Sequence, residues 1–169
     1  MGQKAITIYT PTTASPHINA EDDAQIHRAY FGGSGITEAD SLLACTKISD
    51  TSVRLASGLF CNQGYMVSVS GGTTSTLAVG AGSANTYRKD YVVADFTRGG
   101  GATADTHVFV VVAGTPAATE VGASLPALTQ DELGAGGARR QEPLFSILMN
   151  GTSLSTITRI AEYVGSYYA

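Results

Sequence analysis

The residues that most often perform chemistry in proteins are few and scattered in this chain of 169 residues. The histidines, His17, His27 and His107, share no i, i+4 spacing, and the spacing of Cys45 and Cys61 matches no zinc motif. We interpret the cysteines as buried thiols and His107 as a strand residue hydrogen-bonded to the backbone. The sequence therefore predicts no metal and no cofactor.

Motifs for nucleophilic attack or nucleotide binding are also missing. Residues 58–64 read GLFCNQG, which lacks the serine of a nucleophile elbow. Acidic pairs such as Glu21 with Asp22 stand where a helix is expected to begin, and there the helix dipole accounts for them. The glycine clusters do not stand between a strand and a helix with a Lys-Ser/Thr pair, as a phosphate loop requires. We therefore expect no catalytic residue and a protein that is not an enzyme.

Composition and charge restrict the partners. Charged residues make up 14% of the chain and hydrophobic residues 43%, which is typical of a folded domain rather than a solvated tail. The net charge is −4 and the densest basic clusters are pairs, Arg88-Lys89 and Arg139-Arg140, so nucleic acid is not an expected partner. No apolar window is long enough for a membrane span, and the first ten residues lack a signal-peptide pattern. We expect a protein made in the cytoplasm, soluble there and without a membrane partner.

The pattern of the chain predicts one helix followed by many strands. Asn19 and the acids after it indicate a helix start, and Gly32-Gly33 a stop, which predicts a helix over 20–31. Short runs rich in Val, Thr, Tyr and Phe follow, separated by turn residues. No helix-length pattern lies between successive runs, so the predicted fold is mainly β, an antiparallel β-sandwich or barrel. The candidate strands are 43–48, 52–56, 58–69, 76–79, 87–97, 106–113 and 144–149.

Finer expectations concern individual segments. The run 107–112 is apolar on both faces and is predicted to be a central, covered strand. Residues 98–101 are predicted to form a mobile hairpin tip, and Thr129 is predicted to cap a short helix that ends at Gly134. At the C-terminus, an apolar stripe at helical spacing favours a short helix, although the tyrosines there also suit a strand.

These patterns divide the chain into three parts. Residues 1–18 are predicted to form an extended N-terminal arm, with a strand-like alternation from Ala5 to Tyr9, that a partner could hold in place. Residues 19–160 form the predicted domain, and residues 161–169 an apolar tail. We hypothesise that the tail is a subunit contact, formed with Ile160 by Tyr163, Val164, Tyr167 and Tyr168, because these apolar side chains need cover. The alternative is that the tail folds back on its own domain.

The order of several segments resembles tail-tip proteins of tailed bacteriophages, and the resemblance spans roughly residues 18–160. One matching segment, Tyr87 to Val93, is similar to the arginine-aspartate strand of these proteins, and Ala113 to Ala118 resembles their KGTPAA turn, with alanine in place of the lysine. The other segments that carry the resemblance are Asp22-Asp23-Ala24, Tyr30 to Gly35, the strands around Gly58 and Gly64, Pro126 to Thr129, Pro143-Leu144-Phe145, Asn150-Gly151-Thr152 and Ile157 to Ile160.

The resemblance implies a non-enzymatic virion structural protein, akin to the N-terminal domain of siphophage upper baseplate proteins and the base domains of tail fibres. It implies localisation in the virion, binding to other virion proteins, and a homo-oligomer, with a trimer favoured by the resemblance only. An alternative is a carbohydrate- or host-receptor-binding module of a phage tail, in which the loop residues Tyr65, Tyr87 and Arg98 face a host-surface glycan. A cell-wall hydrolase is a third reading, which the lack of an acid-base pair disfavours.

Overall fold

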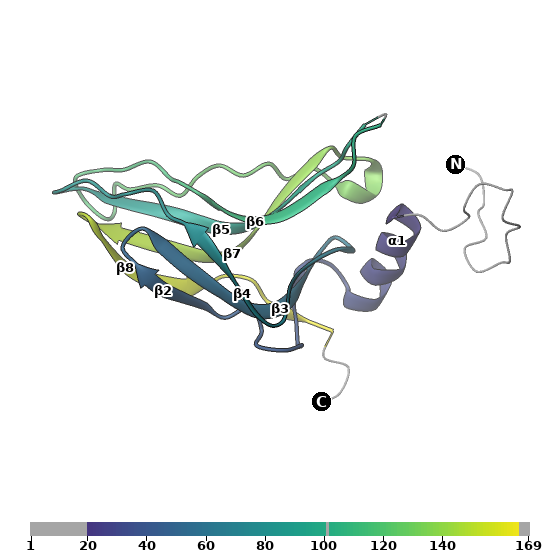
Figure 1. Cartoon of the computed structure of the whole chain (residues 1–169). Coiled ribbons are helices and arrows are strands. Elements are labelled where there is room, and N and C mark those ends of the chain that lie inside the picture. The colour runs from purple at the N-terminus through teal and green to yellow at the C-terminus, as the bar shows by residue number, and fades with distance from the viewer. Residues whose placement is uncertain (1–19, 101, 166–169) are drawn as a thin grey trace, which may run out of the picture.

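Two curled β-sheets share one apolar core, and a single α-helix covers one end of them (Figure 1). The computed structural model describes residues 20–100 and 102–165. In chain order the elements are α1 (Ala20–Phe31), β1 (Gly35–Thr37), β2 (Cys45–Ser49), β3 (Ser52–Asn62), β4 (Tyr65–Ala78), β5 (Tyr87–Thr97), β6 (Thr106–Val112), the 3-10 turn η1 (Leu133–Ala135), β7 (Arg139–Asn150), β8 (Ser153–Arg159) and β9 (Tyr163–Val164). The predicted mainly-β fold with an N-terminal helix is confirmed.

The first sheet is built around the β3–β4 hairpin. Strand β4 pairs with one side of β3, β2 and β1 pair with successive parts of the other side, and β9 extends the sheet beyond β1. The β1–β9 pair is parallel, whereas the other pairs of both sheets are antiparallel. The second sheet has the order β6-β5-β7-β8.

Side chains of both sheets alternate between the core and the outside. Val53 on β3 and Val92 on β5 are fully buried in the same cluster, so the two sheets bury their inner faces against each other. A smaller cluster lies under the helix, where Ala24 packs with Tyr65, Phe96 and Leu133. Each fully buried large apolar side chain stabilises the fold by roughly 1.5–3 kcal/mol, so this second cluster attaches α1 to the sheets.

Several element predictions are confirmed closely. The helix occupies the predicted range, and β5 has the predicted bounds. The predicted strand 52–56 lies within β3. The prediction of one strand over 58–69 is wrong, because the chain turns back at Gln63 and Gly64, so residues up to Asn62 belong to β3 and residues from Tyr65 onward belong to β4. No helix within residues 20–100 and 102–165 is long and apolar enough to cross a membrane.

The prediction of a central, covered strand at 107–112 is wrong. Strand β6 stands at the edge of its sheet, and β5 and β7 occupy the inner positions. Val108 is 48% exposed, and the residues after it are only partly buried. The apolar run therefore belongs to an edge strand with one partly exposed face, and not to a central strand that is covered on both faces.

The predicted C-terminal helix is also wrong for the residues that the structure describes. Tyr163 and Val164 form β9, and the Ile36 N–H donates to the Glu162 carbonyl at 2.9 Å, which draws this segment alongside β1. Gly165 follows with a φ of 84°, outside the helical region. Tyr167 and Tyr168 lie outside the described residues.

The helix predicted to begin at Thr129 is not formed. The Thr129 N–H donates to the Gln141 side chain at 3.1 Å, and its carbonyl accepts from the Gln141 N–H at 2.9 Å, so this residue is held against β7. The only regular turn in this segment is η1, which begins at Leu133. Pairing with a neighbouring strand replaced the local helix signal here, as it did at the C-terminus.

Candidate functional site

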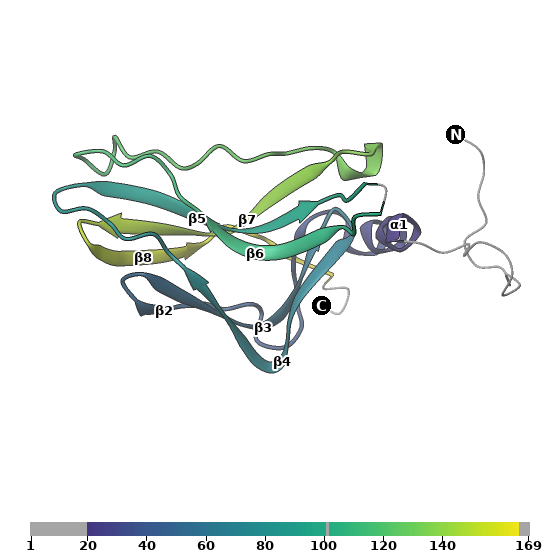
Figure 2. The same ribbon diagram turned by 45° about the horizontal axis from the view of Figure 1, so that its top comes forward.

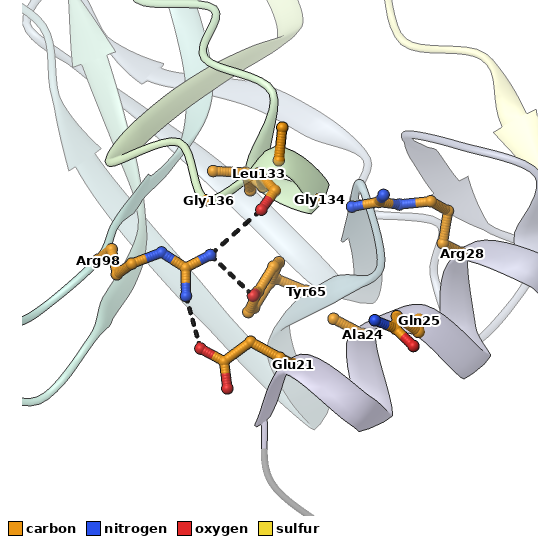
Figure 3. A pocket seen from close by; sticks show the side chains of 10 residues that line it. Glu21, Ala24, Gln25, Arg28, Tyr65, Arg98, Leu133, Gly134 and Gly136 are labelled. Carbon is orange, nitrogen blue, oxygen red and sulfur yellow. Dashed lines mark hydrogen bonds and ion pairs between the residues drawn. The ribbon is translucent and has the colours of Figure 1, made fainter. Parts of the chain in front are cut away.

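The structure brings two of the three predicted ligand-facing residues together and separates the third. Tyr65 begins β4 and Arg98 follows β5, and they meet beside α1 (Figure 3). Tyr87 begins β5, so the length of that 11-residue strand separates it from Arg98, about 33–36 Å at the rise of an extended chain. The three residues therefore do not form one site.

Arg98 is held by four residues from three separate segments of the chain. Its Nη1 donates to Glu21 Oε1 at 2.7 Å, and its Nη2 donates to the Tyr65 hydroxyl at 3.0 Å and the Leu133 carbonyl at 3.3 Å. Its Nε donates to the Gly137 carbonyl at 3.2 Å. These bonds connect the helix, the β3–β4 hairpin and the loop around η1 to the end of β5, so the guanidinium joins the parts of this end of the fold.

The Tyr65 side chain is also held by its neighbours. Its side chain lies under α1 and only 9% of the residue is exposed. The Phe96 ring lies 4.3 Å from the Tyr65 ring between centroids, and the guanidinium carbon of Arg98 lies 5.6 Å from the same centroid. Burial opposes the charge on Arg98, but the Tyr65 hydroxyl and the Glu21 carboxylate favour it, and the pKa of Arg98 is raised. The predicted loop position of Tyr65 is therefore a buried one, with its ring facing protein.

A hollow of about 320 Å³ opens beside this pair (Figure 3). Its second arginine, Arg28, donates from Nε and Nη2 to the Gln63 carbonyl at 3.2 and 3.0 Å. No serine, cysteine or histidine is among the lining residues, and the acid there, Glu21, is paired with Arg98. The hollow thus presents charges already bound to protein groups and no pair of groups arranged for acid-base or nucleophilic chemistry.

His107 lies against a second hollow, of about 250 Å³, which Ala20 at the start of α1 also lines. Its ring meets the Phe96 ring edge-on, with centroids 5.6 Å apart. Both ring nitrogens are buried without a hydrogen-bond partner among the described residues, so the predicted backbone hydrogen bond is not formed with normal geometry. Burial lowers the pKa of His107 to about 4, although the nearby Met66 backbone and Asp95 act in the opposite direction.

This depressed pKa predicts a loss of stability in mild acid. Between the unfolded value of about 6.5 and the folded value of about 4, the unfolded chain binds a proton that the folded chain does not, so stability falls as the pH falls through this range. The loss is at most about 3.5 kcal/mol, at about 1.4 kcal/mol per pKa unit. The free energy of unfolding of His107→Phe, measured in urea, should fall less between pH 7 and pH 4.5 than that of the native chain. The His27→Gln variant is the control. If the free energy of unfolding of His107→Phe fell with pH as steeply as that of the native chain and of this control, His107 would not be the source of the acid sensitivity.

The predicted subunit-contact residues lie partly on the surface. Ile160 is 39% exposed and Tyr163 is 40% exposed, while Val164 is half-buried. The guanidinium carbon of Arg159 stands 4.1 Å from the centre of the Tyr163 ring. We refer to Ile160, Tyr163 and Val164 as the C-terminal patch. Tyr163 and Val164 end the first sheet beside β1, whereas Ile160 follows β8 and its N–H donates to the Leu144 carbonyl of β7 at 2.8 Å.

A buried carboxylate that the sequence did not single out joins two distant segments. Asp90 is fully buried, and its Oδ1 and Oδ2 accept from Nε and Nη2 of Arg88, both at 2.8 Å. The N–H of Gly114 donates to the same Oδ1 at 3.0 Å. A Cβ at Gly114 would stand 2.1 Å from the Lys89 carbonyl oxygen and 2.2 Å from that of Ser124, so only glycine fits. We call Arg88, Asp90 and Gly114 the Asp90 junction.

A signal for this junction was present in the sequence. Arg88 and Asp90 are two residues apart in a predicted strand, which places them on one face within reach of each other. Oppositely charged residues on one face of a strand that is rich in apolar residues indicate an ion pair.

Comparison of the chain with protein-family models, with curated proteins and with solved structures gave no match. Within residues 20–100 and 102–165, no three His, Cys, Asp or Glu side chains gather as they would around a metal ion.

Proposed function

We propose that this chain is a non-enzymatic structural subunit of a tailed-bacteriophage virion, in the tail tip, the baseplate or the base of a fibre. In this proposal the two sheets form a β-sandwich that acts through its surfaces. Copies of the chain bind one another, with a trimer as the expected oligomer, and bind other virion proteins.

The Asp90 junction is the observation that carries the proposal. The resemblance to tail-tip proteins rests on short segments, two of which are the arginine-aspartate strand and the turn around Gly114. These segments are 24 residues apart at Asp90 and Gly114, yet one carboxylate binds both. If the two segments resembled tail-tip proteins only by chance, they would not be expected to contact each other in the fold. Their contact at Asp90 supports the view that they form one structural unit.

The exposed apolar residues support self-association. The C-terminal patch carries two large apolar side chains that are about two-fifths exposed, on a chain with only 14% charged residues. Exposed apolar side chains that lie together are typical of interfaces. A carbohydrate- or host-receptor-binding role is the alternative, and a polar hollow of about 560 Å³ where Tyr87 lies beside Asn150 and Ser153 is where it would act.

The test combines the oligomeric state with the location of the chain. Light scattering of the full chain should give a defined oligomer, and mass spectrometry of purified tailed particles encoded by the same genome should detect the chain. Ile160→Ser with Tyr163→Ser should lower the oligomeric order. Ile48→Ser is the matched control, because Ile48 is 44% exposed but lies on β2.

A native chain that is monomeric at all concentrations and absent from the particles would overturn the proposal. Saturable binding of such a monomer to a glycan array, lost in Tyr87→Ala, would favour the alternative. An oligomer that the double variant leaves intact would remove the C-terminal patch from the interface.

A further inference from the structure

The edges of the two sheets are not protected equally. An exposed edge strand offers unpaired backbone groups to other chains, and proteins commonly block such edges with charges, bulges or cover. On one side of the fold β2 and β8 are tied together, because Lys47 Nζ donates to the Leu154 carbonyl at 2.8 Å and Asp50 Oδ1 accepts from the Leu154 N–H at 3.0 Å. This side is closed by charged side chains.

The opposite side has one blocked edge and one open edge. On β4, residues 70–73 stand opposite the single residue Ser57, which makes a large bulge. This bulge contains Gly72 with a φ of 74°. Strand β6 has neither a bulge in its pairing with β5 nor a proline, lysine or acidic residue. Among the described strands β6 pairs with β5 alone, so its outer edge is free there.

A groove follows this open edge. It has a volume of about 420 Å³ and is lined by residues 67–70 and 73–75 of β4 and by residues 107–109 of β6. Figure 2 shows β6 on the rim of its sheet, with β4 of the other sheet bending away from it. On β6, Phe109 and Val111 pack against the core, so Val108 and Val110 point to the outer face.

The N-terminal arm has the sequence that such an edge accepts. Residues 5–9 read AITIY and alternate, with Ile6 and Ile8 on one side and Ala5, Thr7 and Tyr9 on the other. No Asp, Glu, Lys or Arg occurs between Lys4 and Glu21, whereas a solvated tail is normally rich in charge. A strand with this alternation would place both isoleucines beside the partly buried Phe109 and Val111.

The geometry points to β6 as the docking edge for residues 5–9 of a neighbouring copy of this chain, which add to the sheet as an extra strand. This inference rests on the proposed function and adds a second contact between the copies, separate from the C-terminal patch. Main-chain hydrogen bonds along β6 supply the affinity, and insertion of Ile6 and Ile8 toward the groove selects the register.

The length of the arm favours a neighbour over the same chain. Ala20 and His107 line one small hollow, so α1 begins next to the start of β6. A strand on β6 of its own chain would be joined to α1 by a connection that is usually only about 2–6 residues long. Ten residues separate Tyr9 from Ala20, and at full extension they span about 33 Å. Pro11 and Pro16 favour extended backbone in this linker, which suits a reach to another subunit.

Aspartates introduced on one or the other face of residues 5–9 test the contact between the arm and β6 in the full chain. Ile6→Asp with Ile8→Asp should raise the concentration at which the oligomer half-dissociates by at least about tenfold, because two charges would face the apolar groove. Ala5→Asp with Thr7→Asp adds the same charge at neighbouring positions on the solvent side and should change that concentration less than about threefold. Light scattering over a dilution series measures both, and urea unfolding of each monomer checks that the fold itself is unchanged.

Cysteine trapping locates the contact and identifies its source. Chains carrying Thr7→Cys and chains carrying Val110→Cys are mixed and oxidised, and a disulfide-linked dimer of the two is expected. Thr7→Cys mixed with Ile48→Cys is the control. The native thiols interfere little, because burial raises the pKa of Cys45 to about 11 and also raises that of Cys61.

The outcomes separate this inference from the proposed function. A native oligomer that survives the Ile6→Asp, Ile8→Asp change and gives no mixed dimer overturns the docking inference and leaves the proposed function standing. A disulfide that forms only within a chain carrying both cysteines shows that the arm binds its own β6, and it overturns the inference as well. A native chain that is monomeric throughout contradicts both.

Discussion

Replacing Asp90 with alanine is expected to lower the free energy of unfolding by about 3–5 kcal/mol, the usual cost of breaking a buried ion pair from one side. The carboxylate is fully buried, and the side chain of Arg88 is only 13% exposed. Without Asp90 the guanidinium loses its bidentate partner and the Gly114 N–H loses its acceptor. Equilibrium unfolding in urea measures the change.

Asp50→Ala is a matched control for this variant. Asp50 also accepts from one basic side chain, Lys47 at 2.6 Å, and from one backbone N–H, that of Leu154 at 3.0 Å. Its side chain is 47% exposed, so water solvates both partners after the change and the loss should be much smaller. Equal losses at Asp90 and Asp50 would mean that burial does not set the strength of the Asp90 junction, contrary to the argument above.

The junction also connects stability with the proposed role. Asp90 holds the segment that begins at Gly114 against β5, and that segment continues through residues that pair with β5 and β7, as in the Tyr87–Ala117 and Gln130–Arg140 bridges. A variant that releases it should alter the surface of the second sheet as well as its stability. Near-ultraviolet circular dichroism of Asp90→Ala is therefore expected to change through the tyrosines of β5.

Elements defined by local signals could be predicted from the sequence. The acids at the start of α1 and the two glycines after it mark both ends of the helix, and β5 has turn residues on either side. Whether a strand is central or at an edge depends on which other strands pair with it. The run in β6 reads as fully covered, yet its neighbours leave Val108 exposed, and no local pattern carries that information.

The candidate site was predictable only residue by residue. The sequence predicts Tyr65 and Arg98 as separate loop residues, and their separation of 33 residues gives no sign that they bind each other. The C-terminal strand β9 was also not predictable from local sequence, since Tyr163 and Val164 fit either a helix or a strand. The Glu162 carbonyl, which accepts from β1, decides for the strand.

Gly64→Ala is expected to detach α1 from the sheets and to cost about 2–5 kcal/mol. A Cβ at Gly64 would stand 1.9 Å from the Ala24 carbonyl oxygen of the helix, and the glycine has a φ of 96°. The left-handed backbone costs alanine about 1–2 kcal/mol, and overpacking against a fixed neighbour typically costs about 1–3 kcal/mol more. The His27 Nδ1, which donates to the Gly64 carbonyl at 3.1 Å, would be displaced with the helix.

Gly72→Ala isolates the backbone part of this cost. Gly72 has a φ of 74°, but a Cβ there would meet nothing within 4 Å, so only the conformational penalty of about 1–2 kcal/mol applies. Urea unfolding of the two variants should therefore differ by the packing part alone. Equal losses would show that the helix yields to the added methyl group without cost.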